Sequence, residues 1–451
     1  MPIRWCTGSS TVRLGSMKTS LLLSFLVILN LAVACAGRAA PPRHSPSVGV
    51  NAIVREVLTA NRQLKAARLR WEALGERPKI VGSLPDPMLS YGYFFDNVET
   101  RVGAQNQRVG ASQKIPFPGK LSLASRRAKQ EALVAAWEYQ TLARELILRA
   151  KDAYYDLYQV ERLGEVLNSE LDLLGAVTKS SQARYETGEA QQPDVLRAQL
   201  TTSDIQKRLL DLTQQREVAL ARLNALRNRR QNSPLEVTTV LSSTSLPDRS
   251  RAMAIALQYR QELQQAGVAI DRDRIGLSIA RMDRLPDLTF GVDYTQVNRN
   301  IFSDPPDNGH DAVVASVSVN VPIWFGKVKA EEREAAKRLE QSQATAEDMR
   351  NNVEADVQSA WFRAQLSHDQ LLLYRQTLVP QAEQSFAATR AGYESAKSSF
   401  IDLLDSERAL LALRLGEVMS ETDLARAMAQ LERAVGVDLS QISKWKGGEA
   451  K

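Results

Sequence analysis

An internal repeat constrains this chain more than any single motif does. Residues 185–199 (YETGEAQQPDVLRAQ) have a near copy at 393–406 (YESAKSSFIDLLDS). Tyr185 and Tyr393 are 208 residues apart, and Asp194 and Asp402 are separated by the same distance. Because equal spacing of matching positions marks a duplicated unit, we expect two copies of one structural unit.

Each copy lies where one long helical pattern ends and another begins. In the first copy, apolar residues recur at three- and four-residue steps over 120–187, and helix resumes over about 194–229. The recurring residues are Leu146, Ala150, Ala153, Leu157, Val160, Leu167, Leu171 and Leu174. Gly188 favours a helix end and Pro193 a helix start. A helix over 120–187 would be about 100 Å long and needs a coiled-coil partner.

The second copy predicts the same hairpin. Its first helical pattern covers 327–395 with an interruption at Pro380, and its second returns to about Val435. Shorter helical patterns precede the strands of each copy, over 51–76 and 249–283. The domains we expect are a signal region at 1–36, a linker at 37–48, a first repeat at 49–229, a connector at 230–248, a second repeat at 249–436 and a tail at 437–451. Each repeat would contain a helix, two strands and a long helical hairpin.

Four segments alternate with period two and are predicted to be strands: 84–96, 107–117, 288–295 and 313–323, with polar loops between the members of each pair. One face of each is apolar, and the other is mostly small or polar. This pattern is typical of membrane barrel strands, but a half-buried strand of a soluble sheet shows it too. The strand edges also repeat, since Leu84-Pro85-Asp86 returns as Leu285-Pro286-Asp287 and Phe117-Pro118-Gly119-Lys120 as Trp324-Phe325-Gly326-Lys327.

The N-terminus predicts export. Residues 21–34 form an apolar run after Lys18 that is too short to span a membrane as a helix and suits a signal peptide, with Met17 as an alternative start. The run ends Ala32-Val33-Ala34-Cys35, which resembles a bacterial lipoprotein cleavage box with Cys35 as the acylated residue. Ordinary cleavage near Ala34 or Ala36, with Cys35 incidental, is the alternative.

Composition argues against several classes of function. The net charge of +6 is spread along the chain without a basic block, which argues against nucleic-acid binding. Cys6 and Cys35 cannot form a disulfide framework or a cysteine metal site. His44, His310 and His368 are far apart, and no phosphate-binding loop or nucleophile motif occurs. We therefore expect no enzyme activity, cofactor or resident metal.

Four membrane strands would require partners. An open sheet leaves unpaired N–H and C=O groups in hydrocarbon, at several kcal/mol each, and four strands are too few to close a barrel. Three protomers would supply 12 strands, enough for a water-filled lumen. The helical hairpins would then form a tube that continues the pore. A non-transporting periplasmic coiled-coil scaffold would explain the helices but not the strands.

The chain resembles the TolC family of outer membrane efflux proteins. The resemblance covers nearly the whole mature chain and includes the duplicated unit, the LPDP and PFPGK strand edges, LVPQAEQS, and most specifically AGYESAKSSFIDLLDSERALL. It implies a homotrimer with a barrel in the outer membrane and an α-helical tunnel in the periplasm. It also implies a periplasmic adaptor and an inner-membrane transporter as partners. The strand-edge motifs resemble the heavy-metal branch, although drug export or type I protein secretion would use the same duct.

The resemblance also assigns site residues. Asp402 and Asp405 share a helix face, and acidic residues near a helix N-terminus can simply stabilise the helix through its dipole. The family motif instead places aspartates at these positions in the pore constriction. Tyr393 and Asp194 match positions that keep the tunnel tip closed. The matching position of the family's gate arginine is Ser398, so the gate would be held less tightly or by other bonds, for example from Lys397. Gly188, Pro193, Ala396 (for an expected glycine) and Lys397 would form the adaptor-contact tip.

Overall fold

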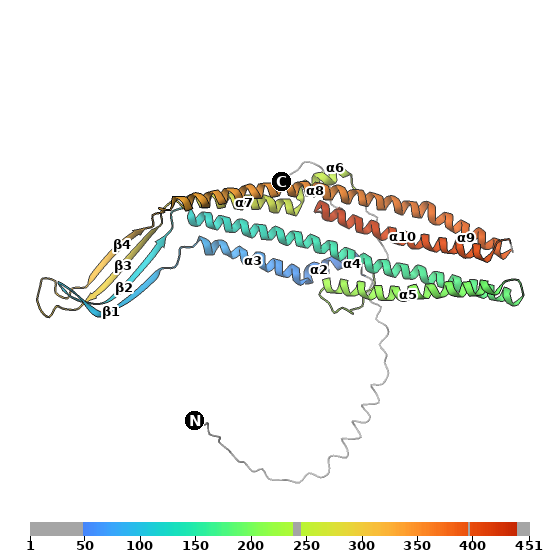
Figure 1. Cartoon of the computed structure of the whole chain (residues 1–451), viewed down its shortest axis with the longest axis horizontal. Coiled ribbons are helices and arrows are strands. Elements are labelled where there is room, and N and C mark those ends of the chain that lie inside the picture. The colour runs from blue at the N-terminus through green and yellow to red at the C-terminus, as the bar shows by residue number, and fades with distance from the viewer. Residues whose placement is uncertain (1–47, 238–244, 396, 440–451) are drawn as a thin grey trace, which may run out of the picture. The chain divides into compact units, whose positions relative to one another are not determined.

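The computed structural model describes residues 48–237, 245–395 and 397–439, and these are mostly helical. Two repeats follow one another with the same order of elements (Figure 1). The first contains α2 (Val50–Ala60), α3 (Arg62–Gly82), β1 (Met88–Thr100), β2 (Gly103–Ile115), α4 (Lys120–Glu186) and α5 (Gln192–Leu226). The second contains α6 (Arg249–Tyr259), α7 (Gln261–Met282), β3 (Leu288–Val297), β4 (Ala312–Val319), α8 (Phe325–Leu373), the π-helical turn η1 (Tyr374–Leu378), α9 (Val379–Glu394) and α10 (Phe400–Val435).

The four strands form one antiparallel sheet in the order β1-β2-β3-β4. The register places most apolar residues of the four strands on one face, as the alternation predicts. One row consists of Leu89, Ala111, Val292 and Ala315, and the next of Tyr91, Val109, Tyr294 and Val313. This face is open, with Leu89 79% and Val313 69% exposed. It therefore needs an apolar environment that the described residues do not supply.

The opposite face of the sheet is mostly small and polar, although Met88 and Val314 also lie on it. Ser90, Gly110 and Asp293 lie side by side across β1, β2 and β3. The Asp293 carboxylate pairs with Arg108 on the neighbouring strand, at 2.9 Å. An apolar face backed by a charged face is the arrangement of a sheet between lipid and water.

Two strand predictions were inaccurate at their ends. The predicted polar loop between the first two strands is instead part of a long hairpin, because polar residues 103–107 belong to the β1–β2 ladder, and a turn at 101–102 joins the strands. The fourth strand ends at Val319 and not at Ile323. Pro322 lacks the N–H that a ladder needs, and helix α8 already begins at Phe325.

The helices predicted over 51–76 and 249–283 are each two helices, which is a second correction. The Asn61 side chain accepts hydrogen bonds from the N–H groups of Gln63 and Leu64, so α3 starts with its own cap. Arg260 occupies the matching break before α7, where its backbone is extended and its guanidinium donates to the Arg433 carbonyl at 3.0 Å.

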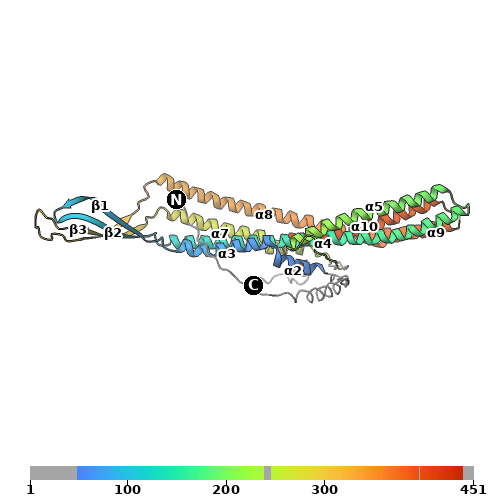
Figure 2. The ribbon, with the colours of Figure 1, turned by 90° about the horizontal axis from the view of Figure 1, so that it is seen from below.

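The long helices pack along one another in both repeats. Helix α4 contacts α3, α5, α7 and α10, and α10 contacts α8 and α9 as well. The strands lie beyond one end of α4, and the turns of the two hairpins lie together at its other end (Figures 1 and 2). In the part of the chain that the structure describes, three apolar clusters lie along the helical bundle. The cluster nearest the turns contains Leu167, Leu174, Phe386, Phe400 and Leu410. Among the described residues, every helix falls short of the apolar length that a membrane crossing needs.

The interruption predicted at Pro380 begins earlier than that residue. The helix changes from α to the wider π type at Tyr374, where η1 begins, and the α-helix resumes at Val379. Because proline has no N–H and its ring crowds the carbonyl four residues before it, a wider turn at this point relieves the conflict. Across the turn, Gly416 of α10 leaves room for the Tyr374 ring, which a Cβ would approach to 2.7 Å.

Candidate functional site

The first candidate site is the pair of turns at the ends of the hairpins. In the α4–α5 turn, Gly188 has a left-handed φ of 78°, and the N–H groups of Glu189 and Ala190 donate to the Arg184 carbonyl at 2.8 and 3.2 Å. Pro193 lies in the first turn of α5. The predicted helix end and helix start are confirmed, and Gly188 and Pro193 are exposed.

The α9–α10 turn folds against Gly392. The N–H groups of Lys397 and Ser398 donate to the Gly392 carbonyl at 2.7 and 3.2 Å. Lys397 is exposed and Ser398 is half-buried, whereas Ala396 lies outside the described residues. A Cβ at Gly392 would lie 2.2 Å from the Ser398 hydroxyl oxygen, so a larger residue here would displace the Ser398 side chain where the turn closes.

Arg184 joins the two turns, and the motifs of the sequence did not predict this role. Its Nη1 donates to the Tyr393 carbonyl at 2.9 Å, and its guanidinium lies over the Tyr393 ring, 4.8 Å from the centroid. The Tyr393 ring also packs near Phe400, with the centroids 5.7 Å apart. One available signal was the difference between the copies, since an arginine precedes Tyr185 and a glycine precedes Tyr393.

Asp194 and Tyr393 are not bonded to each other within the chain. Asp194 lies in the first turn of α5, and its carboxylate is 3.7 Å from the Arg197 guanidinium. Among the residues that the structure describes, no hydrogen bond connects Asp194 with Tyr393 or Ser398.

Asp402 and Asp405 are both exposed near the start of α10, but their surroundings differ. Asp402 completes a capping box, accepting from the Ser399 hydroxyl at 2.7 Å and the Ser399 N–H at 3.0 Å. These hydrogen bonds hold the pKa of Asp402 below its ordinary value. The Asp405 carboxylate is 3.9 Å from the Arg408 guanidinium, and both side chains are largely exposed. Both aspartates thus present charge to solvent, and Asp402 also stabilises its helix.

A buried carboxyl pair lies farther from the turns. Glu170 of α4 and Glu407 of α10 are each only 2% exposed, among the leucines of the cluster nearest the turns. Burial and the neighbouring Glu170 carboxyl raise the pKa of Glu407 to about 9. Two buried carboxylates repel each other, so at neutral pH Glu407 is the protonated member.

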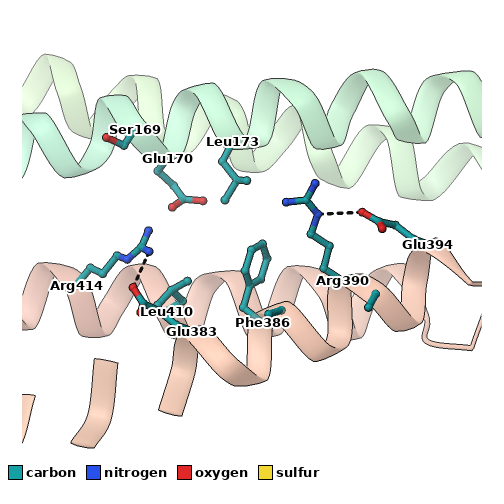
Figure 3. A pocket seen from close by; sticks show the side chains of 11 residues that line it. Ser169, Glu170, Leu173, Glu383, Phe386, Arg390, Glu394, Leu410 and Arg414 are labelled. Carbon is teal, nitrogen blue, oxygen red and sulfur yellow. Dashed lines mark hydrogen bonds and ion pairs between the residues drawn. The ribbon is translucent and has the colours of Figure 1, made fainter. Parts of the chain in front are cut away.

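A pocket of about 600 Å³ borders Glu170 between α4 and α9 (Figure 3). Leu173, Phe386 and Leu410 form its apolar walls. The two arginines that line it are already paired, Arg414 with Glu383 at 2.9 Å and Arg390 with Glu394 at 3.0 Å. Among the described residues, no group of three or more His, Cys, Asp or Glu side chains is placed to hold a metal ion.

Asp287 joins the sheet to the helices. Its carboxylate accepts hydrogen bonds from the Phe117 N–H at 3.0 Å and Lys120 Nζ at 2.9 Å, and it pairs with Lys114 at 3.1 Å. Burial acts in the opposite direction, but these contacts lower the pKa of Asp287 to about 2. The second LPD motif is therefore bonded to the PFPGK motif where β2 ends and β3 begins.

Residues 53–229 and 253–437 match the family described as outer membrane efflux protein. The chain belongs to this family. The Brucella suis outer membrane efflux protein BepC is 23% identical over 327 residues, covering 67% of this chain and 68% of the relative. The Cupriavidus metallidurans cobalt-zinc-cadmium resistance protein CzcC is 19% identical over 343 residues, covering 75% and 79%.

Solved structures of outer membrane proteins share the fold. The crystal structure of VceC from Vibrio cholerae matches with a TM-score of 0.73 at 18% identity, covering 86% of this chain and 96% of that one. Membership of the outer membrane efflux protein family places this protein in the bacterial outer membrane, with a large periplasmic helical part. It is a channel protein and not an enzyme.

Proposed function

We propose that three copies of this outer membrane efflux protein form the exit duct of a tripartite efflux system. The observation that carries the proposal is the sheet, which has an open apolar face and two unpaired edges, at β1 and β4. In hydrocarbon, each unpaired backbone group would cost several kcal/mol, so the edges must find strands. Pairing β4 of each copy with β1 of the next closes a barrel, and three copies give 12 strands.

The helical hairpins would continue the pore into the periplasm. In this assembly Asp402 and Asp405 would form acidic rings at the constriction, favouring cations. Tyr393, Asp194 and Ser398 would lie at the gate, where Arg184 supplies the bond that Ser398 cannot. The exposed residues Gly188, Pro193 and Lys397, with Ala396 between the described segments, would contact the adaptor.

The duct would be passive, with a periplasmic adaptor and an inner-membrane transporter as partners. Family membership supports this arrangement. The relative CzcC is named for cobalt, zinc and cadmium resistance, which together with the LPDP and PFPGK edges favours heavy-metal cations as cargo. Cys35, outside the described residues, would carry the lipid that anchors the mature N-terminus.

The first test is the mass of the processed protein, extracted from outer membranes in mild detergent and measured by light scattering with the detergent subtracted. A trimer that forms ion-conducting channels in planar bilayers supports the proposal. A monomer that stays soluble without detergent would contradict it, because its open sheet would then have no membrane role. Cargo is tested separately, by whether deleting the gene sensitises the host to cobalt, zinc and cadmium or to organic drugs.

A further inference from the structure

The contact between β2 and β3 offers a template for the contact between copies. At this junction Lys120, at the start of the helix after β2, binds Asp287, just before β3. The Lys120 side chain is 14% exposed and the Asp287 side chain 11% exposed, so the pair is largely shielded from water. Both residues belong to repeated motifs, and the pair connects one repeat with the other.

The remaining members of these motifs lie at the two open edges of the sheet. Asp86 precedes β1 as Asp287 precedes β3, and Lys327 follows β4 as Lys120 follows β2. Both are exposed, and the Lys327 side chain remains 71% exposed, with Glu331 one turn away at 3.7 Å. Each edge thus carries one member of a complementary pair of charges.

We propose that Lys327 of one copy binds Asp86 of the next copy and forms the intersubunit counterpart of the Lys120–Asp287 pair. This inference rests on the proposed closed barrel, in which β4 meets β1 of the neighbour. The antiparallel direction is the same as at the β2–β3 junction, so a residue after β4 lies at the same end as a residue before β1. The contact would anchor each subunit boundary where the barrel joins the helical tube.

The apolar faces allow a pairing that differs from the β2–β3 ladder by one residue. In the β2–β3 ladder Ala111 lies opposite Val292, and both side chains belong to the apolar face. Counted from Lys327 and Asp86, the corresponding arrangement between copies places Ser318 of β4 opposite Tyr91 of the neighbour's β1. Ser318 belongs to the polar face, so a shift of one residue, which places Val319 opposite Tyr91, is needed to continue the apolar face. Val319 and Tyr91 are both exposed on the apolar face in the single chain. The register that continues the apolar face therefore also brings the complementary charges to one end.

Cross-linking tests the contact directly. The double variant Asp86→Cys/Lys327→Cys is treated in outer membranes with a short bismaleimide and analysed on denaturing gels. We expect dimers and trimers from the double variant, and neither from Asp86→Cys nor Lys327→Cys alone, which also controls for Cys6 and Cys35. A matched control, Asp86→Cys/Lys337→Cys, moves the lysine position ten residues, about 15 Å, along α8 and should not cross-link.

Charge reversal tests the energetic role. Asp86→Lys and Lys327→Glu should each shift the monomer–trimer equilibrium toward monomer, about tenfold overall for three pairs of this kind, and the double reversal should restore it. The contact is wrong, while the channel proposal stands, if the wild type is trimeric but two results are negative. These are no cross-linking of the double cysteine variant and no restoration of the trimer by the double charge reversal. If the wild type itself is monomeric, the channel proposal fails first.

Discussion

The guanidinium of Arg184 lies over the ring of Tyr393 and connects the ends of the two helical hairpins. The distance from the guanidinium carbon to the ring centroid is 4.8 Å, and Nη1 also donates to the Tyr393 carbonyl at 2.9 Å. Arg184 belongs to the end of α4 and Tyr393 to the end of α9. An opening in which the hairpins separate would have to break both contacts.

Arg184→Ala should therefore open the tip. We expect larger and longer single-channel openings in planar bilayers than for the wild type, and greater entry of a large antibiotic such as vancomycin into cells. Tyr393→Leu should act in the same direction because it removes the ring. Tyr393→Phe should remain close to wild type, since the ring and the backbone carbonyl are both retained.

Arg197→Ala is the matched control for this prediction. Arg197 is another arginine of the same tip, and it pairs with Asp194 within α5 rather than with the second hairpin. It should leave the openings unchanged. Equal conductance of Arg184→Ala and wild-type channels would show that the Arg184–Tyr393 contact does not hold the gate.

Regular features of this fold could be predicted from the sequence because they depend on local pattern. Strand alternation placed Tyr91 and Val109 on one face, and the register confirms it. The length of α4 followed from its apolar steps. The break at Asn61 is also local, because asparagine is a preferred N-cap residue, and the sequence could have revealed it.

Other features depend on which distant segments meet. Arg184 and Tyr393 are 209 residues apart, and the local sequence around either residue does not predict contact with the other. Glu170 lies three residues after Leu167 and four before Leu174, so it occupies a core position. From sequence alone, however, a glutamate in a helix with many charged residues is predicted to be exposed. Only the packing of α4 on α10 shows that Glu170 meets a second buried glutamate.

Asp402 and Asp405 should separate in their effects, although the sequence motif presents them as equivalent. Asp405→Asn should reduce cation selectivity, measured as the reversal potential across a potassium chloride gradient, with little change in thermal stability. Asp402→Ala should reduce selectivity and also lower the unfolding temperature, because it removes the capping box with Ser399. Asp402→Ser/Ser399→Asp would test whether a cap alone restores stability without restoring selectivity. Unchanged reversal potentials in both single variants would contradict a pore location.

Asp287→Asn should weaken the junction between the sheet and the helices. We expect a loss of about 1–3 kcal/mol in the free energy of unfolding near neutral pH, because Lys114 and Lys120 lose a charged partner. The pKa of Asp287 is lowered to about 2 in the folded protein, so its contribution is present above the ordinary aspartate pKa and is lost as pH falls toward about 2. The measurement is thermal unfolding of the wild type and of Asp287→Asn across this acid range, in which their stabilities should converge as the pH falls. Asp271→Asn, at an exposed α7 residue paired with Arg274, should change stability little at any pH.

Glu407→Gln should stabilise the helical bundle increasingly as pH rises. The pKa of Glu407 is raised to about 9, so folding requires the residue to take up a proton at every pH between its ordinary value and about 9. The wild type should therefore lose stability on going from about pH 5 to about pH 9, whereas the glutamine variant carries no such proton and should lose less. We expect its advantage to be small at about pH 5 and to reach about 1–2 kcal/mol or more at about pH 9.

The measurement for Glu407→Gln is the thermal midpoint of the helical circular dichroism signal at both pH values. Glu383→Gln is the matched control, because Glu383 is an exposed carboxylate that pairs with Arg414 beside the same pocket. Its difference from wild type should not grow with pH in this range. Parallel pH profiles for wild type and Glu407→Gln would mean that water or a cation compensates the buried pair, and the assignment of a stored proton to Glu407 would then be wrong.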